Sequence, residues 1–137
     1  MSQYVTFDQS AAPLIYAVIH NVEPTQTIWD AFLVDFEAFL TNQEPFAIMF
    51  DLTHAKLISM HMVNQLAAFM KSQDQLLKNK IIASAVLSNN ALVRGILDIA
   101  FKIRKPSKPN IITKHTEKAS KFLIHACQAA GVTLPPM

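Results

Sequence analysis

The chain alternates short runs of consecutive apolar residues with longer segments in which apolar residues recur every three or four positions. In the clearest example, residues 46–52 are apolar apart from Asp51, a short polar turn follows, and a helical pattern starts near Ser59. An apolar run of this length is typical of a strand covered on both faces. Because the unit of strand, turn and helix recurs along the chain, the sequence predicts an α/β domain.

The full pattern predicts the order β-β-α-β-α-β-α-β-α. We expect strands at residues 4–7, 12–21, 46–52, 81–87 and 110–114 and helices at about 25–42, 59–78, 91–104 and 116–130. The first two strands suit a hairpin, which makes the first a short antiparallel edge strand. Right-handed crossovers then make the later strands parallel. We expect one domain spanning residues 1–137.

Bulk composition excludes several classes of protein. With 137 residues, 51% of them hydrophobic and 16% charged, the chain can bury a core and does not resemble a disordered protein. A net charge of +2 is too small to attract nucleic acid, and no apolar run is long enough to span a membrane. The start of the chain lacks the features of a signal peptide. We therefore expect a cytoplasmic protein, in which the single cysteine, Cys127, is a small core residue.

The order and lengths of these elements resemble the STAS fold, in particular the SpoIIAA-like proteins, over roughly residues 4–131. Two segments carry the resemblance. Residues 50–59 (FDLTHAKLIS) are similar to the family's strand that ends in Asp-Leu-Ser/Thr before a turn and a hydrophobic pair. Residues 88–97 (SNNALVRGIL) are similar to the family's strand-to-helix junction, which has Val-Arg near the helix start. Residues 117–122 are similar in residue type to the opening of the family's last helix. The resemblance implies a non-enzymatic regulatory or protein-interaction domain.

One departure from the family pattern bears on regulation. Anti-sigma-factor antagonists of this family carry Asp-Ser-Ser/Thr-Gly at the start of the second helix, and the first serine accepts phosphate from a partner kinase. Here the aligned residues are Ser59, Met60, His61 and Met62, so Met60 stands at the phospho-acceptor position. Ser59 could accept phosphate only if the register shifted by one residue. We interpret Ser59 as the N-cap of the helix and leave open whether it is ever phosphorylated.

The carboxyl ends of parallel strands meet at one edge of a sheet, where ligands usually bind and where helix N-termini favour anions. Polar residues predicted at this edge are the first hypothesis for a site that binds a protein partner. The candidate residues are Asp51, Thr53, His54, Ser59, Met60, His61, Ser88, Asn89 and Asn90. The alternative interpretation is that they are ordinary helix caps and loop residues.

The second hypothesis is a carrier or sensor of a small apolar or lipid ligand. Methionine, frequent near the second predicted helix, is the adaptable residue of apolar pockets as well as of cores. Some STAS-like proteins resemble the CRAL-TRIO lipid-transfer fold at this level. Such a binder should contain an apolar cavity of roughly 300 Å³ or more. The residues expected to line it are Met62, Leu66, Phe69, Leu97 and Phe101.

A local basic cluster could contribute to binding under either hypothesis, or it could have no role in binding. It comprises Lys102, Arg104, Lys105 and Lys108 and precedes the last predicted strand. Lysine and arginine clusters contact anions or phospholipid headgroups, although a solvated loop is the simpler interpretation.

Enzymatic and metal-dependent classes have little support. The five histidines show no His-x-x-x-His spacing, so we expect no metal site. The two glycines are too few for a Gly-x-Ser-x-Gly nucleophile elbow or a glycine-rich phosphate loop. We assign no catalytic residue and no cofactor, and an enzyme that uses His54 or His61 with Asp51 is a third hypothesis. A homodimer is possible, and the partner, the ligand and the biological process are left open.

Overall fold

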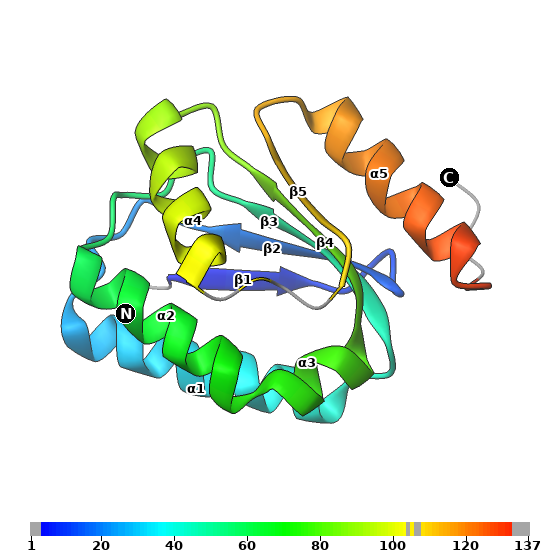
Figure 1. The fold of residues 1–137 in the computed structure, drawn as a ribbon, viewed down its shortest axis with the longest axis horizontal. Coiled ribbons are helices and arrows are strands. Elements are labelled where there is room, and N and C mark those ends of the chain that lie inside the picture. The colour runs from blue at the N-terminus through cyan, green and yellow to red at the C-terminus, as the bar shows by residue number, and fades with distance from the viewer. Residues whose placement is uncertain (1–3, 104, 106–107, 133–137) are drawn as a thin grey trace.

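The computed structural model describes residues 4–103, 105 and 108–132. Its five-stranded sheet follows chain order, β1-β2-β3-β4-β5 (Figure 1). The strands are β1 (Val5–Asp8), β2 (Leu14–Ile19), β3 (Phe46–Asp51), β4 (Ile81–Leu87) and β5 (Asn110–Thr113). The β1–β2 pair is antiparallel and the other three pairs are parallel. The predicted fold class, with its antiparallel edge strand, is confirmed.

The helices differ from the prediction at one place. They are α1 (Gln26–Asn42), α2 (Met60–Ser72), α3 (Asp74–Lys80), α4 (Ala91–Ile103) and α5 (Thr116–Ala129). The continuous helix expected over residues 59–78 was wrong, because the chain breaks at Gln73. The side chain of Gln73 donates a hydrogen bond to Glu37 of α1 at 3.1 Å. The break lets Leu76 and Leu77 of α3 join the apolar cluster beneath α1 and α2.

Helix α5 covers one face of the sheet, and its packing depends on small residues. Ala47 of β3 and Ala83 and Ala85 of β4 face this helix and are fully buried. Small side chains let a helix approach the strands closely, so Leu123 and Cys127 of α5 are also fully buried. Gly131 follows the helix with φ 75°, a left-handed conformation that commonly ends a helix.

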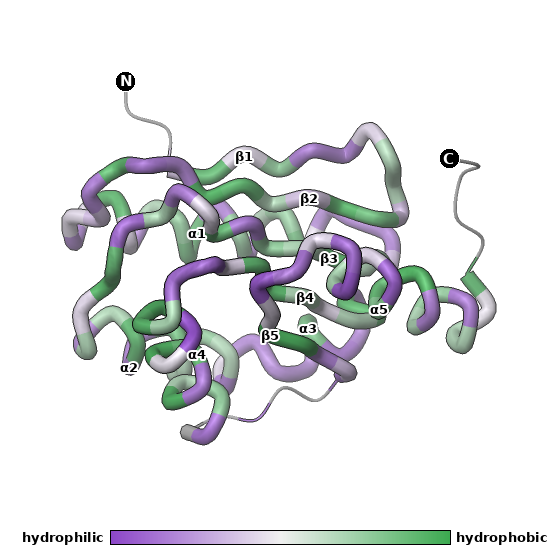
Figure 2. Tube along the Cα trace, turned by 90° about the horizontal axis from the view of Figure 1, so that it is seen from above, coloured by the Kyte–Doolittle hydropathy of each residue, from purple (hydrophilic) through white to green (hydrophobic). Residues whose placement is uncertain are grey.

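Helices α1 to α4 lie on the opposite face, where large aromatic residues form the core. Phe36 of α1 contacts Phe50 of β3 and Phe69 of α2, with ring centroids 5.6 and 5.8 Å apart. Helix α4 packs against the same face through Val93 and Leu97. In Figure 2 the helices alternate between hydrophobic and hydrophilic residues along their turns, because one side of each meets the sheet and the other meets solvent. The two faces are therefore packed by different means.

Cys127 offers a test of the α5 face. Burial raises the pKa of its thiol, and the side chain has no solvent exposure, so both reactivity and access are reduced. We expect a thiol reagent to modify the native protein roughly a hundredfold or more slowly than the denatured chain, as measured by absorbance.

Two variants complete the labelling test. Leu123→Ala removes a buried side chain from the same helix face, which costs about 2–5 kcal/mol, and should accelerate labelling. Lys121→Ala alters an exposed position on α5 and should leave the rate nearly unchanged. Native labelling at the denatured rate would contradict the packing of α5 described above.

Candidate functional site

The ends of β3 and β4 bring several predicted site residues to one edge of the sheet. Asp51 closes β3 and lies in register with Leu87 of β4, which Ser88 follows directly. Ser59 precedes α2, and Asn90 precedes α4. The structure thus places the predicted residues on adjacent loops, as expected for a parallel sheet.

The polar side chains at this edge make local hydrogen bonds. Asp51 Oδ1 accepts a hydrogen bond from the Thr53 N–H at 2.9 Å. Ser59 Oγ accepts one from the Met62 N–H at 3.2 Å, which confirms the predicted N-cap of α2. Asn90 Oδ1 caps α4 by accepting from the Leu92 N–H at 2.9 Å. These groups have structural roles, and their contact with a partner stays a prediction.

Ser88 differs from its neighbours because it is fully buried. Its Oγ accepts a hydrogen bond from the Asn90 N–H at 3.2 Å, and its carbonyl accepts one from Arg94 Nη1 at 2.9 Å. A buried serine bonded in this way orients the turn into α4 but presents no free group to a ligand. Asn89, the residue between, is exposed.

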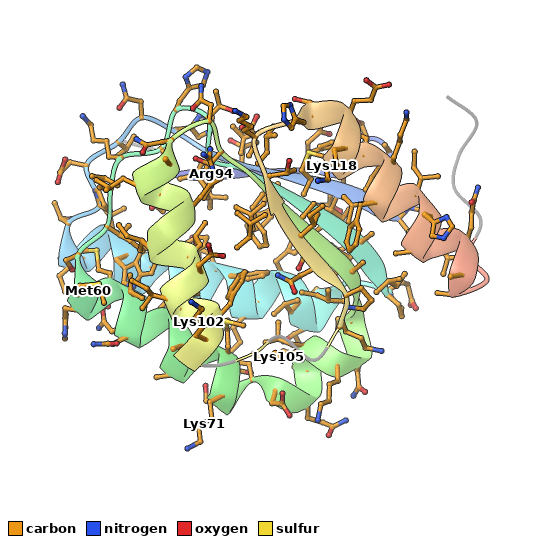
Figure 3. All side chains as sticks on the ribbon, turned by 45° about the horizontal axis from the view of Figure 1, so that its top comes forward. Met60, Lys71, Arg94, Lys102, Lys105 and Lys118 are labelled. Carbon is orange, nitrogen blue, oxygen red and sulfur yellow. The ribbon has the colours of Figure 1, made fainter. Side chains whose placement is uncertain are left out.

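The remaining predicted residues at this edge are exposed around the start of α2. Thr53 and His54 lie in the turn after β3, and Met60 and His61 open α2. Met60 is 50% exposed and lies at the outer end of α2 in Figure 3. An exposed methionine beside polar residues is compatible with a contact surface, but the structure alone identifies no partner.

The described residues include no cluster of three or more His, Cys, Asp or Glu side chains that could hold a metal ion. Asp51, His54 and His61, the residues of the enzyme hypothesis, form no such group. Within the same part of the chain, no helix combines the length and the apolar character needed to cross a bilayer.

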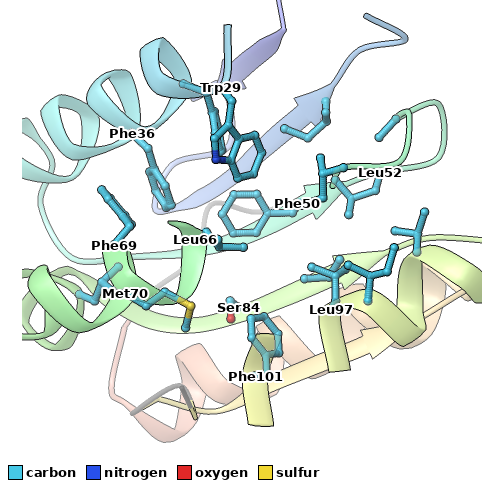
Figure 4. A pocket seen from close by; sticks show the side chains of 18 of the residues that line it. Trp29, Phe36, Phe50, Leu52, Leu66, Phe69, Met70, Ser84, Leu97 and Phe101 are labelled. Carbon is cyan, nitrogen blue, oxygen red and sulfur yellow. The ribbon is translucent and has the colours of Figure 1, made fainter. Parts of the chain in front are cut away.

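An apolar cavity lies between the sheet and helices α1, α2 and α4 (Figure 4). Its volume is about 180 Å³. Aromatic and aliphatic side chains supply most of the lining. The residues labelled in Figure 4 are Trp29, Phe36, Phe50, Leu52, Leu66, Phe69, Met70, Ser84, Leu97 and Phe101.

Four of the five residues predicted for an apolar pocket line this cavity: Leu66, Phe69, Leu97 and Phe101. Met62 does not, and that assignment was wrong. Met62 is 8% exposed and packs in the core cluster shared with α1 and the sheet.

The sequence reasoning missed the wall that α1 contributes. Trp29 and Phe36 fall within the predicted first helix, but helical spacing alone does not distinguish a residue in a filled core from one beside a cavity. Phe50 of β3 and Ser84 of β4 were likewise read only as strand residues. Ser84, a serine within an otherwise apolar strand, was the one sequence signal that could have indicated the cavity.

Charged residues lie at the rim of the cavity. Lys56, Lys105 and Lys108 are exposed residues of its lining, and Asp74, also in the lining, forms an ion pair with Lys78 at 2.9 Å. Part of the predicted basic cluster therefore borders the cavity. Figure 3 places Lys102 and Lys105 near the C-terminal end of α4, whereas Arg104 lies outside the described residues.

Two aromatic residues bring polar atoms to the inner part of the lining. Tyr4 is 8% exposed, and burial raises the pKa of its hydroxyl to about 12. Trp29 packs edge-on against Tyr4, with ring centroids 6.3 Å apart, and its indole Nε1–H has no hydrogen-bond partner within the described chain. The cavity is thus apolar but not free of hydrogen-bonding groups.

No protein-family model matches this chain, and searches of curated proteins and of solved structures find no match either. The resemblance to STAS-like proteins therefore stays a prediction. Functional inference depends on the geometry of the site.

The N-cap role of Ser59 can be tested by substitution. Ser59→Ala removes the acceptor for the Met62 N–H, so we expect the free energy of unfolding to fall by about 1 kcal/mol in urea denaturation. Ser59→Asp restores an acceptor and places negative charge at a helix N-terminus, so it should stay within about 0.5 kcal/mol of the parent. Equal stability of the alanine and parent proteins would show that the cap contributes nothing.

The buried hydroxyl of Tyr4 predicts a dependence of stability on pH. Its pKa is about 12 in the folded protein and 10.0 in the reference state, so the unfolded chain loses this proton first. The contribution of neutral Tyr4 to the free energy of unfolding is therefore fully present below pH 10. It is lost as the pH rises from 10 to 12, which lowers the free energy of unfolding by about 2–3 kcal/mol. We expect the urea midpoint of the parent to fall more steeply over this range than that of Tyr4→Phe. Parallel pH profiles would contradict this assignment.

Proposed function

We propose that this protein is a non-enzymatic domain that binds a small apolar ligand, as a carrier or sensor, in the cavity between the sheet and helices α1, α2 and α4. The observation that supports the proposal is the cavity of about 180 Å³ with its mainly apolar lining. Interiors of proteins usually pack without voids of this size, because each void forfeits contacts between its walls. An apolar space of this volume is explained when a ligand supplies the missing contacts.

The size of the cavity limits the class of ligand. Its volume is below the roughly 300 Å³ that the sequence analysis expects for a carrier of a lipid, so that expectation is not met and the proposal is restricted to a smaller ligand. An engineered apolar cavity of about 150 Å³ binds benzene. The space therefore suits a molecule of about six to ten non-hydrogen atoms, which is the apolar end of a larger compound or a small compound by itself.

The composition of the lining supports a binding site that exists before the ligand arrives. Phe36 contacts both Phe50 and Phe69, so rings from three separate elements pack together in the wall. Rigid rings lose little conformational freedom when a ligand binds, so little of the binding free energy is spent on ordering them. The basic rim at Lys56, Lys105 and Lys108 adds a charged border to the entrance.

The first hypothesis from the sequence, a protein-interaction domain of STAS-like type, is the second candidate. One observation favours it: Leu57 and Met60, beside the predicted contact residues Ser59 and His61, are 44% and 50% exposed. Adjacent exposed apolar side chains are typical of surfaces that bind another protein. In either case we propose that the domain acts in the cytoplasm, as the composition predicts.

The first experiment is native mass spectrometry of the protein purified from cells. We expect an added mass that disappears on denaturation, which would identify a bound ligand. A clean mass together with no response to small apolar probes would leave the protein-interaction candidate ahead. The same spectrum would report whether the chain is a monomer or a homodimer.

A variant that fills the cavity provides the matched test. Ser84→Leu adds apolar volume to the lining, and Ser120→Leu makes the same change at a half-buried position on α5, across the sheet. We expect toluene to raise the melting temperature of the parent and of Ser120→Leu, because a ligand that binds only the folded state stabilises it. Ser84→Leu should lose this response while keeping its own folded structure by circular dichroism. An unchanged response in Ser84→Leu would refute binding in this cavity.

A further inference from the structure

The lining of the cavity is more exposed on one side than on the other. Trp29 and Phe36 of α1 are 3% and 5% exposed. Met70, Ser84 and Phe101 line the same space but are partly exposed, and in Figure 4 they lie across it from Trp29. The exposed fraction of the lining is thus higher where α2, β4 and the C-terminal end of α4 meet. We call this the open side of the cavity.

Two lysines lie on the open side. Lys105 and Lys108 belong to the segment between α4 and β5, and both are exposed residues of the cavity lining. The Ser84 N–H donates a hydrogen bond to the Pro109 carbonyl at 3.0 Å, which holds the backbone next to Lys108 against the cavity wall. The third lysine of the lining, Lys56, follows the carboxyl end of β3. That end and the amino end of β5 lie at opposite edges of the parallel sheet.

The charge of the open side is positive. Within the described part of the chain, neither Lys105 nor Lys108 forms an ion pair or a hydrogen bond. The carboxylate of the described lining, Asp74, forms an ion pair with Lys78 at 2.9 Å, which offsets its negative charge. Two ammonium groups beside an apolar space are complementary to a molecule that joins an apolar body to an anionic group.

We propose that the cavity binds the apolar body of a small amphiphilic anion, such as a medium-chain carboxylate, whose charged group contacts Lys105 and Lys108. This inference rests on the proposed function and specifies its ligand. The volume of about 180 Å³ suits the apolar body, of about six to ten non-hydrogen atoms. Because both lysines are exposed, the anion keeps its contact with water and avoids the cost of burying a charge.

The test compares two ligands that differ in charge. Octanoate and octanamide share the same chain and a planar end group of similar size, and at about pH 7 the carboxylate is ionised whereas the amide is neutral. We expect octanoate to bind roughly three- to tenfold more tightly at low salt, because exposed ion pairs contribute modestly. About 1 M NaCl should remove most of this difference, since it shortens the screening length to about 3 Å. Dissociation constants from NMR titration of ¹⁵N-labelled protein supply the ratios.

Variants then assign the charged contact. Lys105→Gln with Lys108→Gln should weaken octanoate binding roughly three- to tenfold and leave octanamide within about twofold of the parent. Lys114→Gln with Lys118→Gln removes the same charge from exposed positions that are not among the described lining residues, and Figure 3 shows Lys118 on α5. This control pair should leave both affinities within about twofold of the parent.

The results with the carboxylate decide the inference. Tighter binding of octanoate that is lost in salt and in the Lys105 and Lys108 variant supports it. Equal affinities for the two ligands, an equal loss in the control pair, or a loss confined to Lys56→Gln would overturn it. Sedimentation of the protein with phosphatidylglycerol vesicles, without competition by octanoate, would assign the two lysines to a bilayer surface and overturn it as well.

The results with neutral ligands separate this inference from the proposed function. If octanamide binds as tightly as octanoate, or if toluene stabilises the protein while octanoate does not bind, this inference alone falls and the apolar-ligand proposal stands. If octanoate, octanamide and toluene all fail to bind up to their solubility limits, both proposals fall.

Discussion

The contact between the aromatic face of α1 and the sheet is the interaction on which the rest of this face depends. Phe32 and Phe36 are buried on this face, and Phe36 contacts one ring of β3 and one ring of α2. Aromatic side chains bury large areas and fix the distance between the elements they join. Because these rings are wide, they hold α1 and α2 away from the strands, and the space beside them is not fully occupied.

The two faces of the sheet are covered by helices in different ways. On the α5 side, Ala47, Ala83 and Ala85 let a single helix settle closely against the strands and leave no exposed surface on Leu123. On the other side, three helices converge over Phe50 and Ser84, and their ridges cannot all fit one sheet surface. The cavity is the space left where these helices meet over the sheet. Its position therefore follows from the layout of helices as much as from any one side chain.

The sequence predicted the sheet well because strand signals are local. Continuous apolar runs such as residues 46–52 and 81–87 identified buried strands, and Ser59 and Asn90 were correctly interpreted as caps. The break at Gln73 was not predictable from spacing, and the hydrogen bond that its side chain donates there goes to Glu37, far away in the chain.

The candidate site was harder to predict than the fold. Helical periodicity identified Leu66, Phe69, Leu97 and Phe101 as inward-facing, and they do line the cavity. The same periodicity assigned Met62 to the lining, although that side chain turns into the core. The unpaired donor of Trp29 had no signal in the sequence, since whether a buried N–H finds an acceptor depends on residues from several elements at once.

The order of the strands in the sheet, which repeats their order in the chain, has a consequence for how the protein folds. The β2–β3 and β4–β5 pairs are each joined through one helix, and the β3–β4 pair through the two helices α2 and α3. Parallel pairs closed by such crossovers form more slowly than a hairpin, so we expect the antiparallel β1–β2 pair to form before them. Of the helices in the described part of the chain, α5 is the one that covers the alanine-lined face, so this apolar surface stays exposed until α5 packs against it.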